Sequence, residues 1–379
     1  CSYERIQLGI AINTRKMTVA LTEQKRKTML DELSNWHKKR KSFTLLQGVT
    51  LCGSLEFWAN TSPWIRFIYL NLRSAVNRSI TFCSDITKKK RKIKNLITEL
   101  STTKGIDNYE QREKFVQSKI ARETYKCNDK AHITNPMRNE LKIMKKILSS
   151  PDKYKLETPI AHIIKREPDF TTFGDASLEA AGGFSEGHFW WHFEWPSNIK
   201  MLTLKNISVN RRCNITKDLV SINLLEFVVE IINYAAITVF FAENSSICEH
   251  EYPFLLNWTD NKTAKAWLRK AATKTEKGKS LQRILCSIMI NSPMGVKSDY
   301  IKGEKNVIAD FISRIFSSQN TAVTFDNLFV KFPQIEYWKR FHPSQELLSH
   351  LCSALLTGQD LGILEIKNLG HFSPGKSTS

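Results

Sequence analysis

The chain has 379 residues, of which 41% are hydrophobic and 10% aromatic, a composition typical of a globular protein that excludes a largely disordered one. Its eight cysteines form no C-x-x-C pair, which argues against a zinc site or a disulfide framework and favours an intracellular compartment, the cytoplasm, the nucleus or both. We expect no membrane partner, because the N-terminus lacks the layout of a signal peptide and no apolar run is long enough to span a bilayer.

The formal net charge of +19 is unevenly distributed. Residues 1–150 carry 30 Lys and Arg against 13 Asp and Glu, whereas residues 151–379 carry 26 against 24. A surplus of this size in one part of the chain is typical of contact with a polyanion, most often nucleic acid, although a solvated basic surface has the same composition. Contacts of this kind are made with phosphates, so we expect binding that depends on salt and not on base sequence.

The first 80 residues predict a strand hairpin followed by helices. Residues 4–21 alternate like paired strands, with a polar turn at 13–15. Thr22 is a plausible N-cap for a helix over 23–41, and two more helices are expected over 43–60 and 64–76. Candidate nucleic-acid contacts on and just after the first helix are Lys25, Lys38, Lys39 and Arg40.

A second basic block, "KKKRKIK", covers residues 88–94 and adds the candidates Lys88, Lys89, Lys90 and Arg91. The block is compatible with a solvated surface, with a helix end that contacts phosphates, or with a nuclear localisation signal. Residues 101–135 are polar and weakly periodic, which indicates a linker, and "MRNELKIMKKILSS" predicts a short helix that Pro151 ends.

Beyond residue 158 the pattern predicts an α/β domain. We expect two strands within 169–195 and a third near 200–209, with later strands over 253–260 and 296–301. Helices should follow Ser221 and Asn261 and cover 279–290 and 306–316. We therefore predict a five-stranded mixed sheet flanked by helices. The expected organisation is 1–100 as a strand hairpin and a basic helical module, 101–157 as a connection, 158–316 as the α/β domain and 317–379 as a C-terminal extension.

Four acidic residues stand at distinctive places in this domain. Asp175 ends the first strand, and Asp260 emerges where "PFLLNWTD" ends, as ligands often do at strand ends. Glu226 lies on the one polar stripe of an apolar helix, which also carries Asn223, Glu230 and Asn233. Asp310 falls just outside the apolar arc of the last helix, formed by Val307, Ile308, Phe311, Ile312 and Ile315. Each acid alone is more often a solvated charge than a ligand.

Together the acids follow the order Asp, Glu, Asp, Asp on strand, helix, strand and helix, and this order resembles ribonuclease H. "GDAS" with the glycine pair, "NLLEFVVEI", "TDNKTAKAWL" and "YIKGEKNVIADFISR" are similar to the corresponding segments of retroelement ribonucleases H. The resemblance implies that Asp175, Glu226, Asp260 and Asp310 are the metal-binding catalytic acids, with Glu230 a weaker candidate. An integrase-like nuclease is disfavoured because that family places its glutamate last.

The N-terminal part resembles a different segment of the same polyproteins. "ERIQLGIAINTRKMTVAL" and "FTLLQGVTLCGSLEFWANTSPW" are similar to the hairpin and thumb that follow the polymerase active site of retrotransposon reverse transcriptases. The resemblance implies that residues 1–100 are the end of the palm and a thumb-like basic helical module, and that an upstream polymerase domain of the same polyprotein is a partner. The YxDD-type acids would lie before residue 1, so we expect no polymerase activity from this segment alone.

The resemblance implies hydrolysis of the RNA strand of RNA–DNA hybrids with two Mg²⁺ ions, for which Mn²⁺ could substitute. Asp175 would bridge both ions, Glu226 and Asp260 would complete the first site and Asp310 the second. Asn261 is a further candidate contact to the nucleic acid. The loop before the last helix lacks the histidine frequent in the family, and Lys302 or Lys305 could replace it in part. The alternative is a remnant that binds nucleic acid without catalysis.

Overall fold

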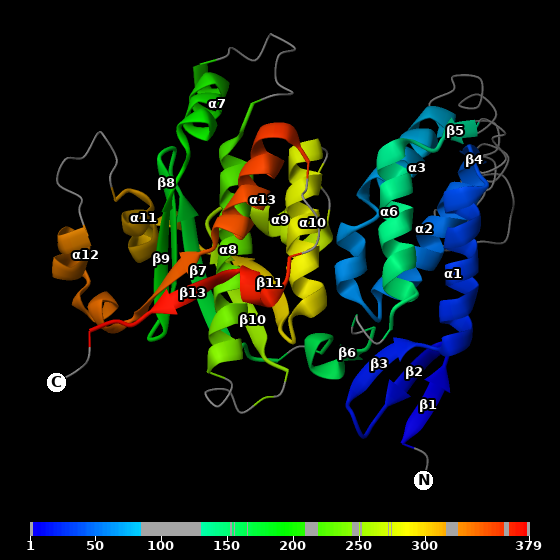
Figure 1. The fold of residues 1–379 in the computed structure, drawn as a ribbon, viewed down its shortest axis with the longest axis horizontal. Coiled ribbons are helices and arrows are strands. Elements are labelled where there is room, and N and C mark those ends of the chain that lie inside the picture. The colour runs from blue at the N-terminus through cyan, green and yellow to red at the C-terminus, as the bar shows by residue number, and fades with distance from the viewer. Residues whose placement is uncertain are drawn as a thin grey trace, which may run out of the picture. The chain divides into compact units, whose positions relative to one another are not determined.

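The computed structural model describes residues 3–84, 130–151, 154, 156–164, 166–208, 219–244, 250, 252–271, 273, 275–315, 325–359 and 364–376 (Figure 1). The chain forms two compact units, one of Leu21–Lys153 and one that joins Cys1–Ala20 to Tyr154–Ser379. The basic block at 88–94 lies outside the described residues. The predicted division at residues 100, 157 and 316 stays a prediction.

The unit Leu21–Lys153 is helical in its described part. Its elements are α1 (Glu23–Lys38), β4 (Ser42–Thr44), α2 (Leu45–Ala59), η1 (Pro63–Phe67), α3 (Leu70–Ser84), β5 (Lys130–His132) and α6 (Asn135–Leu148). The predicted start of α1 is confirmed, since the Thr22 side chain accepts a hydrogen bond from the Lys25 amide. The helix expected from residue 64 is instead a 3-10 turn that begins at Pro63, followed by α3.

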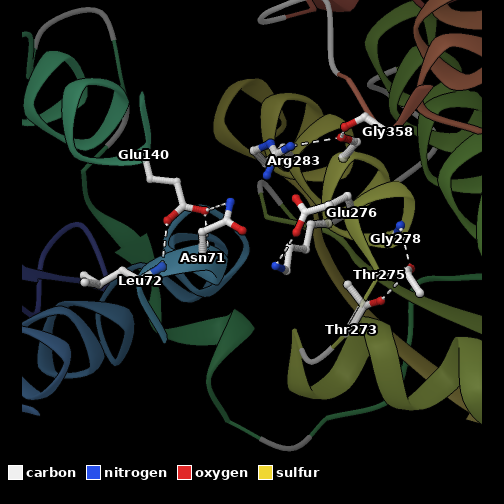
Figure 2. Close-up of polar contacts among 11 residues, drawn as sticks. Asn71, Leu72, Glu140, Thr273, Thr275, Glu276, Gly278, Arg283 and Gly358 are labelled. Atoms are coloured by element: carbon white, nitrogen blue, oxygen red, sulfur yellow. Dashed lines mark hydrogen bonds and ion pairs between the residues drawn. The ribbon is translucent and has the colours of Figure 1, made fainter. Parts of the chain in front are cut away.

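Glu140 on α6 is hydrogen-bonded to the N-terminal end of α3 (Figure 2). This carboxylate is 2% exposed. Its Oε1 accepts hydrogen bonds from the amide and the side chain of Asn71, each at 2.8 Å, and its Oε2 accepts one from the Leu72 amide at 3.1 Å. Both amides belong to the first turn of α3, which otherwise has no intrahelical partner for them. The buried charge is thus satisfied by the helix end that it caps.

The second unit begins with a small sheet of order β1-β2-β3-β6. Its strands are β1 (Glu4–Gln7), β2 (Ile10–Asn13), β3 (Thr18–Leu21) and β6 (Thr158–Pro159). The sequence predicts one turn, at 13–15, whereas the sheet has a second one before it. Residues Leu8 and Gly9, with φ of 53° and 83°, make an additional tight turn that splits the first predicted strand.

The main sheet has seven strands in the order β11-β10-β7-β8-β9-β12-β13, so the prediction of five is wrong. The strands are β7 (Phe170–Ala176), β8 (Ala180–Ser185), β9 (Phe189–Glu194), β10 (Phe254–Thr259), β11 (Gly295–Tyr300), β12 (Lys339–Pro343) and β13 (Gly370–Ser373). The two additional strands come from the predicted C-terminal extension. β12 pairs in parallel with β9, and β13 pairs antiparallel with β12, which extends the sheet beyond β9.

The region 169–209 also differs from the prediction. Residues 169–195 hold three strands, not the two predicted there, and the strand expected near 200–209 is instead helix α7 (Ser197–Ser208). The glycine pair Gly182 and Gly183 lies inside β8, where helices approach both faces. A Cβ at Gly182 would lie 2.4 Å from Ile312, and one at Gly183 would lie 2.4 Å from Asn233. These glycines therefore permit close packing.

The remaining helices of this unit are α8 (Ile222–Glu243), α9 (Lys262–Lys270), α10 (Glu276–Asn291), α11 (Val307–Ser313), α12 (Phe325–Lys331) and α13 (Gln345–Thr357), with short turns η2 (Ile160–His162), η4 (Gly303–Lys305), η5 (Pro333–Tyr337) and η6 (Ile366–Asn368). By length and composition α8 could cross a membrane, contrary to the prediction that no segment could. In this fold 94% of its apolar window is buried, as in the core helix of a globular domain. It packs on β7 and β8.

Helices α10 and α13 are joined by polar contacts (Figure 2). The Ser280 hydroxyl donates to the Gly358 carbonyl at 2.6 Å and accepts from Arg283 at 2.9 Å. Thr275 caps α10 by accepting from the Gly278 amide at 3.1 Å. Gly358 ends α13 with φ of 71°, a left-handed conformation that favours glycine. The C-terminal segment is therefore bonded to the main body of this unit through α13 as well as through β12.

Candidate metal centre

Three of the predicted acids converge at one edge of the main sheet. β7 and β10 are parallel neighbours, so Asp175 near the end of β7 and Asp260 just after β10 emerge at the same edge. Glu226 on α8, which packs against β7, completes the group. One carboxylate oxygen from each residue lies within 4.8 Å of those of the other two. This spacing allows the three carboxylates to share one cation.

Asp310 lies beside this group and outside it. Its carboxylate on α11 is 45% exposed, and its Oδ1 accepts from Nε and Nη2 of Arg314 at 2.8 and 2.7 Å. It remains near enough for its negative charge to raise the pKa of both Asp175 and Asp260. The fold therefore brings three of the four acids together and keeps the fourth within electrostatic reach.

Burial and mutual repulsion disfavour the ionised form of these acids. The pKa of Asp175 is raised to about 6, mainly by burial; the Ser313 hydroxyl opposes this shift, and the charges of Asp260 and Asp310 add to it. Burial, then the charges of Asp175 and Asp260, raise the pKa of Glu226 well above its ordinary value. Burial, then the charge of Asp310, also raises the pKa of Asp260. A bound cation would relieve both effects.

The donor set fits a hard divalent cation. Glu226 is 4% exposed, and its buried Oε2 has no hydrogen-bond partner in the described part of the chain. Leaving a buried acceptor unpaired is costly unless another ligand takes it. Carboxylate oxygens are the ligands that Mg²⁺ and Ca²⁺ prefer. The cluster of Asp175, Glu226 and Asp260 is therefore a candidate metal site.

Glu230, the weaker candidate, lies one helical turn further along α8 and is outside the group of three. It is 1% exposed, and burial raises its pKa to about 8. The Ser298 hydroxyl donates to its Oε1 at 3.3 Å, and its Oε2 has no partner among the described residues. Glu230 thus belongs to the protein interior below the site.

A buried polar network continues from there. Asn257 Oδ1 accepts from the Thr172 hydroxyl at 2.9 Å and from Asn233 Nδ2 at 3.0 Å, and Asn233 Oδ1 accepts from Trp191 at 2.8 Å. Because of this network, the alternate face of β10 with Leu255, Asn257 and Thr259 is the buried one. The other face, with Phe254, Leu256 and Trp258, is only partly buried.

Two polar residues at the ends of α11 were missed by the sequence analysis. Ser313 is buried, and its hydroxyl donates to Asp175 Oδ2 at 2.6 Å. Asn306 is also buried, and its Nδ2 donates to the Gly174 carbonyl at 2.9 Å. The predicted apolar arc of α11 is partly wrong, because Val307 is 46% exposed. The sequence signal that could have identified Ser313 is its position as a small polar residue among apolar ones, on the same short helix as Asp310.

The surroundings of the acids leave room for a substrate. A cavity of about 440 Å³ is lined by residues that adjoin the site, among them Ala176, Ser177, Ile222 and Arg314. The loop before α11 passes close to the acids, since a Cβ at Gly303 would lie 3.1 Å from Asp260 Oδ2. Lys302 and Lys305 in this loop are exposed.

The predicted nucleic-acid contacts have mixed environments. In the helical unit Lys25, Lys38 and Lys39 are exposed, and the Arg40 guanidinium lies over the Trp36 ring at 5.0 Å. Asn261 caps α9 by accepting from two amides, and its Nδ2 donates to Asn223 at 2.8 Å. Lys88, Lys89, Lys90 and Arg91 lie outside the described residues. Contact with nucleic acid stays a prediction for all of them.

No protein-family model matches the chain, and no curated protein matches it. Among solved structures, it is similar to a foamy viral protease-reverse transcriptase in complex with dsDNA, with 11% identity over 80% of this chain and 45% of that chain. A complex of that protease-reverse transcriptase with an RNA/DNA hybrid shares 10% identity over 78% of this chain and 29% of that chain. The chain thus spans less than half the length of these chains. The TM-score is 0.21 in both cases, which is too low to assign a fold from the similarity.

Proposed function

We propose that this chain is a divalent-metal-dependent nuclease of the ribonuclease H type, which hydrolyses the RNA strand of RNA–DNA hybrids. The observation that carries the proposal is the convergence of Asp175, Glu226 and Asp260, with ligand oxygens within 4.8 Å of one another at the end of two parallel strands. The order of these acids along the chain, continued by Asp310, supports the ribonuclease H type over other nucleases.

A pair of Mg²⁺ ions, when bound, would supply an activated water and stabilise the leaving oxygen of the phosphodiester. Asp175 would hold both ions, Glu226 and Asp260 the first, and Asp310 the second. The ion pair between Asp310 and Arg314 is exposed on both sides and therefore weak, so Asp310 can exchange Arg314 for a cation. Mn²⁺ would substitute for Mg²⁺ because it accepts the same oxygen ligands.

The substrate would be held by its backbone. The lysines of the N-terminal half favour phosphate contacts, which are insensitive to base sequence. The cavity beside Asp175 could take the strand to be cut, and an RNA–DNA hybrid would be distinguished by its shape and its 2′-hydroxyls. We further propose an upstream polymerase domain as a partner and an intracellular location.

Cleavage of a labelled RNA–DNA hybrid in Mg²⁺ tests the proposal, with Asp260→Asn as the decisive variant. Loss of groups that only support a metal ligand costs roughly 10- to 100-fold in activity, so loss of a ligand itself should exceed about 100-fold. Asp299→Asn is the matched control, because Asp299 lies on the neighbouring strand β11 and pairs with Lys265 outside the cluster. Cleavage that survives in Asp260→Asn would refute the assignment.

A non-catalytic nucleic-acid-binding remnant is the second candidate. The observation that favours it is the engagement of Asp310 with Arg314, which leaves three acids and not four in the cluster. In that case the wild-type chain would bind the hybrid with a strong dependence on salt, yet produce no cleavage in Mg²⁺ or Mn²⁺. The same labelled hybrid, assayed by filter binding and by gel, distinguishes the two functions.

A further inference from the structure

Helix α11 is bonded to the end of β7 from both of its termini. At its start the Asn306 side chain donates to the Gly174 carbonyl, and at its end the Ser313 hydroxyl donates to Asp175 Oδ2 at 2.6 Å. The Ser313 carbonyl in turn accepts from the Ser177 hydroxyl at 2.7 Å. These contacts link residues 132 to 138 positions apart in sequence. The last turn of α11 therefore has a fixed position relative to the Asp175 carboxylate.

Ser313 has two acceptors within reach of its single proton. Asp175 Oδ2 lies at 2.6 Å and the Asp310 carbonyl, one turn back in the helix, at 2.9 Å. Hydrogen bonds to an ionised carboxylate are shorter and stronger than those to a neutral carbonyl, so the proton goes to Asp175 whenever that group is charged. The bond occupies Oδ2 and restricts rotation of the carboxylate, which leaves Oδ1 to act as a ligand oxygen.

The next residue along the helix has a different relation to the site. Arg314 pairs with Asp310, and its side chain is 56% exposed. A solvent-exposed ion pair contributes little, and this one places a positive charge beside the carboxylates that a cation would approach. The fully buried Ser313 competes with nothing, because a carboxylate oxygen that accepts a hydrogen bond leaves the other oxygen free.

We propose that Ser313 is a positioning residue, which orients Asp175 for cation binding by donating a hydrogen bond to its Oδ2. Arg314, its neighbour, opposes cation binding by holding Asp310. This role of Ser313 rests on the metal-dependent function proposed above. It predicts opposite effects from two adjacent substitutions on the same seven-residue helix.

A titration of the full chain with Mn²⁺ tests the role without any substrate. Binding is measured as the loss of the free-ion signal in electron paramagnetic resonance. Ser313→Ala should weaken Mn²⁺ binding about 10- to 100-fold, the usual cost of losing a group that orients a metal ligand. Ser313→Thr keeps the hydroxyl and should restore most of the affinity. Arg314→Gln should increase the affinity, and an unchanged or lower affinity would overturn the opposing role of Arg314.

Ser287→Ala is the matched control for a general loss of stability. Ser287 is also buried in a helix and donates to the carbonyl three residues back, at 2.7 Å, but in α10. If Ser313→Ala does not fold, Ser313→Cys replaces it, because a thiol is a weak donor of similar shape and should give a smaller loss.

The outcomes separate the two proposals. If the wild-type chain binds no Mn²⁺, the proposed function fails and the role of Ser313 fails with it. If the wild type binds and Ser313→Ala binds equally well, only the positioning role is overturned. An equal loss of affinity in Ser313→Ala and Ser287→Ala would also overturn it, since the effect would then come from the fold as a whole.

Discussion

Each unit of this protein buries a glutamate, and the two differ in what surrounds the carboxylate. Glu140 in the helical unit accepts three hydrogen bonds from the start of α3. Glu226 in the other unit lies beside two further acids and keeps one oxygen without a partner in the described residues. Burial alone therefore does not indicate a functional site. A carboxylate that its own fold satisfies is structural, whereas one that the fold leaves unsatisfied is available to a ligand.

The largest effect should come from removing the satisfied carboxylate. Glu140→Leu keeps the volume but leaves the buried amides of Asn71 and Leu72 without their acceptor, and each buried donor left unpaired costs about 1–3 kcal/mol. Hydrogen exchange of the α3 amides under native conditions would measure this as faster local opening. Glu140→Gln retains one acceptor oxygen and should lose less.

The matched control for this change is Glu23→Leu in the same unit. Glu23 is likewise a glutamate with polar partners, but these are the side chains of Arg26 and Lys27, and they lie on the exposed side of α1. Its removal should have a much smaller effect because solvent screens surface ion pairs. Equal losses in the two variants would show that the three hydrogen bonds to Glu140 contribute nothing beyond a surface pair.

Much of the fold could be predicted because it depends on local signals. The N-caps Thr22, Ser221 and Asn261 mark the beginnings of α1, α8 and α9 as expected. The failures involve contacts between distant segments. The glycines of β8 look like a turn in sequence, but helices α8 and α11 approach them from both faces. Nothing local indicates that β12 pairs with β9.

The candidate site follows the same rule. The proximity of Asp175, Glu226 and Asp260 could be predicted because each lies at a recognisable place on its own strand or helix. Ser313 and Asn257 could not, because what makes them important is a partner 138 and 85 positions away. A buried polar side chain looks like any other until the fold supplies the group to which it bonds.

The second prediction concerns pH in the absence of divalent metal. The folded pKa of Asp175 is about 6 and that of Glu230 about 8, both above the values of about 4 expected for the unfolded chain. At these two sites the folded state therefore binds more protons, and their contribution to its stability is greatest below pH 4 and falls as pH rises towards 8. The loss from Asp175 alone should be about 3 kcal/mol.

Thermal unfolding in EDTA from about pH 6.5 to pH 9 would measure the upper part of this trend, above the range in which His162 and His192, with pKa values lowered by burial to about 4, give the opposite dependence. Saturating Mg²⁺ should reverse it above pH 6, because a cation that binds the ionised carboxylates stabilises the folded state by mass action. A melting temperature that rises steadily with pH in EDTA would contradict the raised pKa values, and it would remove the contrast with a carboxylate like Glu140 that the fold satisfies.

The smallest expected effect is the change in stability caused by Glu226→Gln, and its sign distinguishes a metal ligand from a structural carboxylate. Glu226→Gln replaces a buried charge, whose Oε2 has no donor among the described residues, by a neutral amide of the same shape, so in EDTA at pH 9 it should stabilise the fold by about 1–2 kcal/mol. Glu230→Gln, one helical turn away, should do likewise. Mg²⁺ separates the two: it should still raise the melting temperature of Glu230→Gln, and it should no longer do so for Glu226→Gln. If Glu226→Gln is instead destabilised in EDTA, the fold satisfies this carboxylate as fully as that of Glu140, and the metal site loses its strongest physical support.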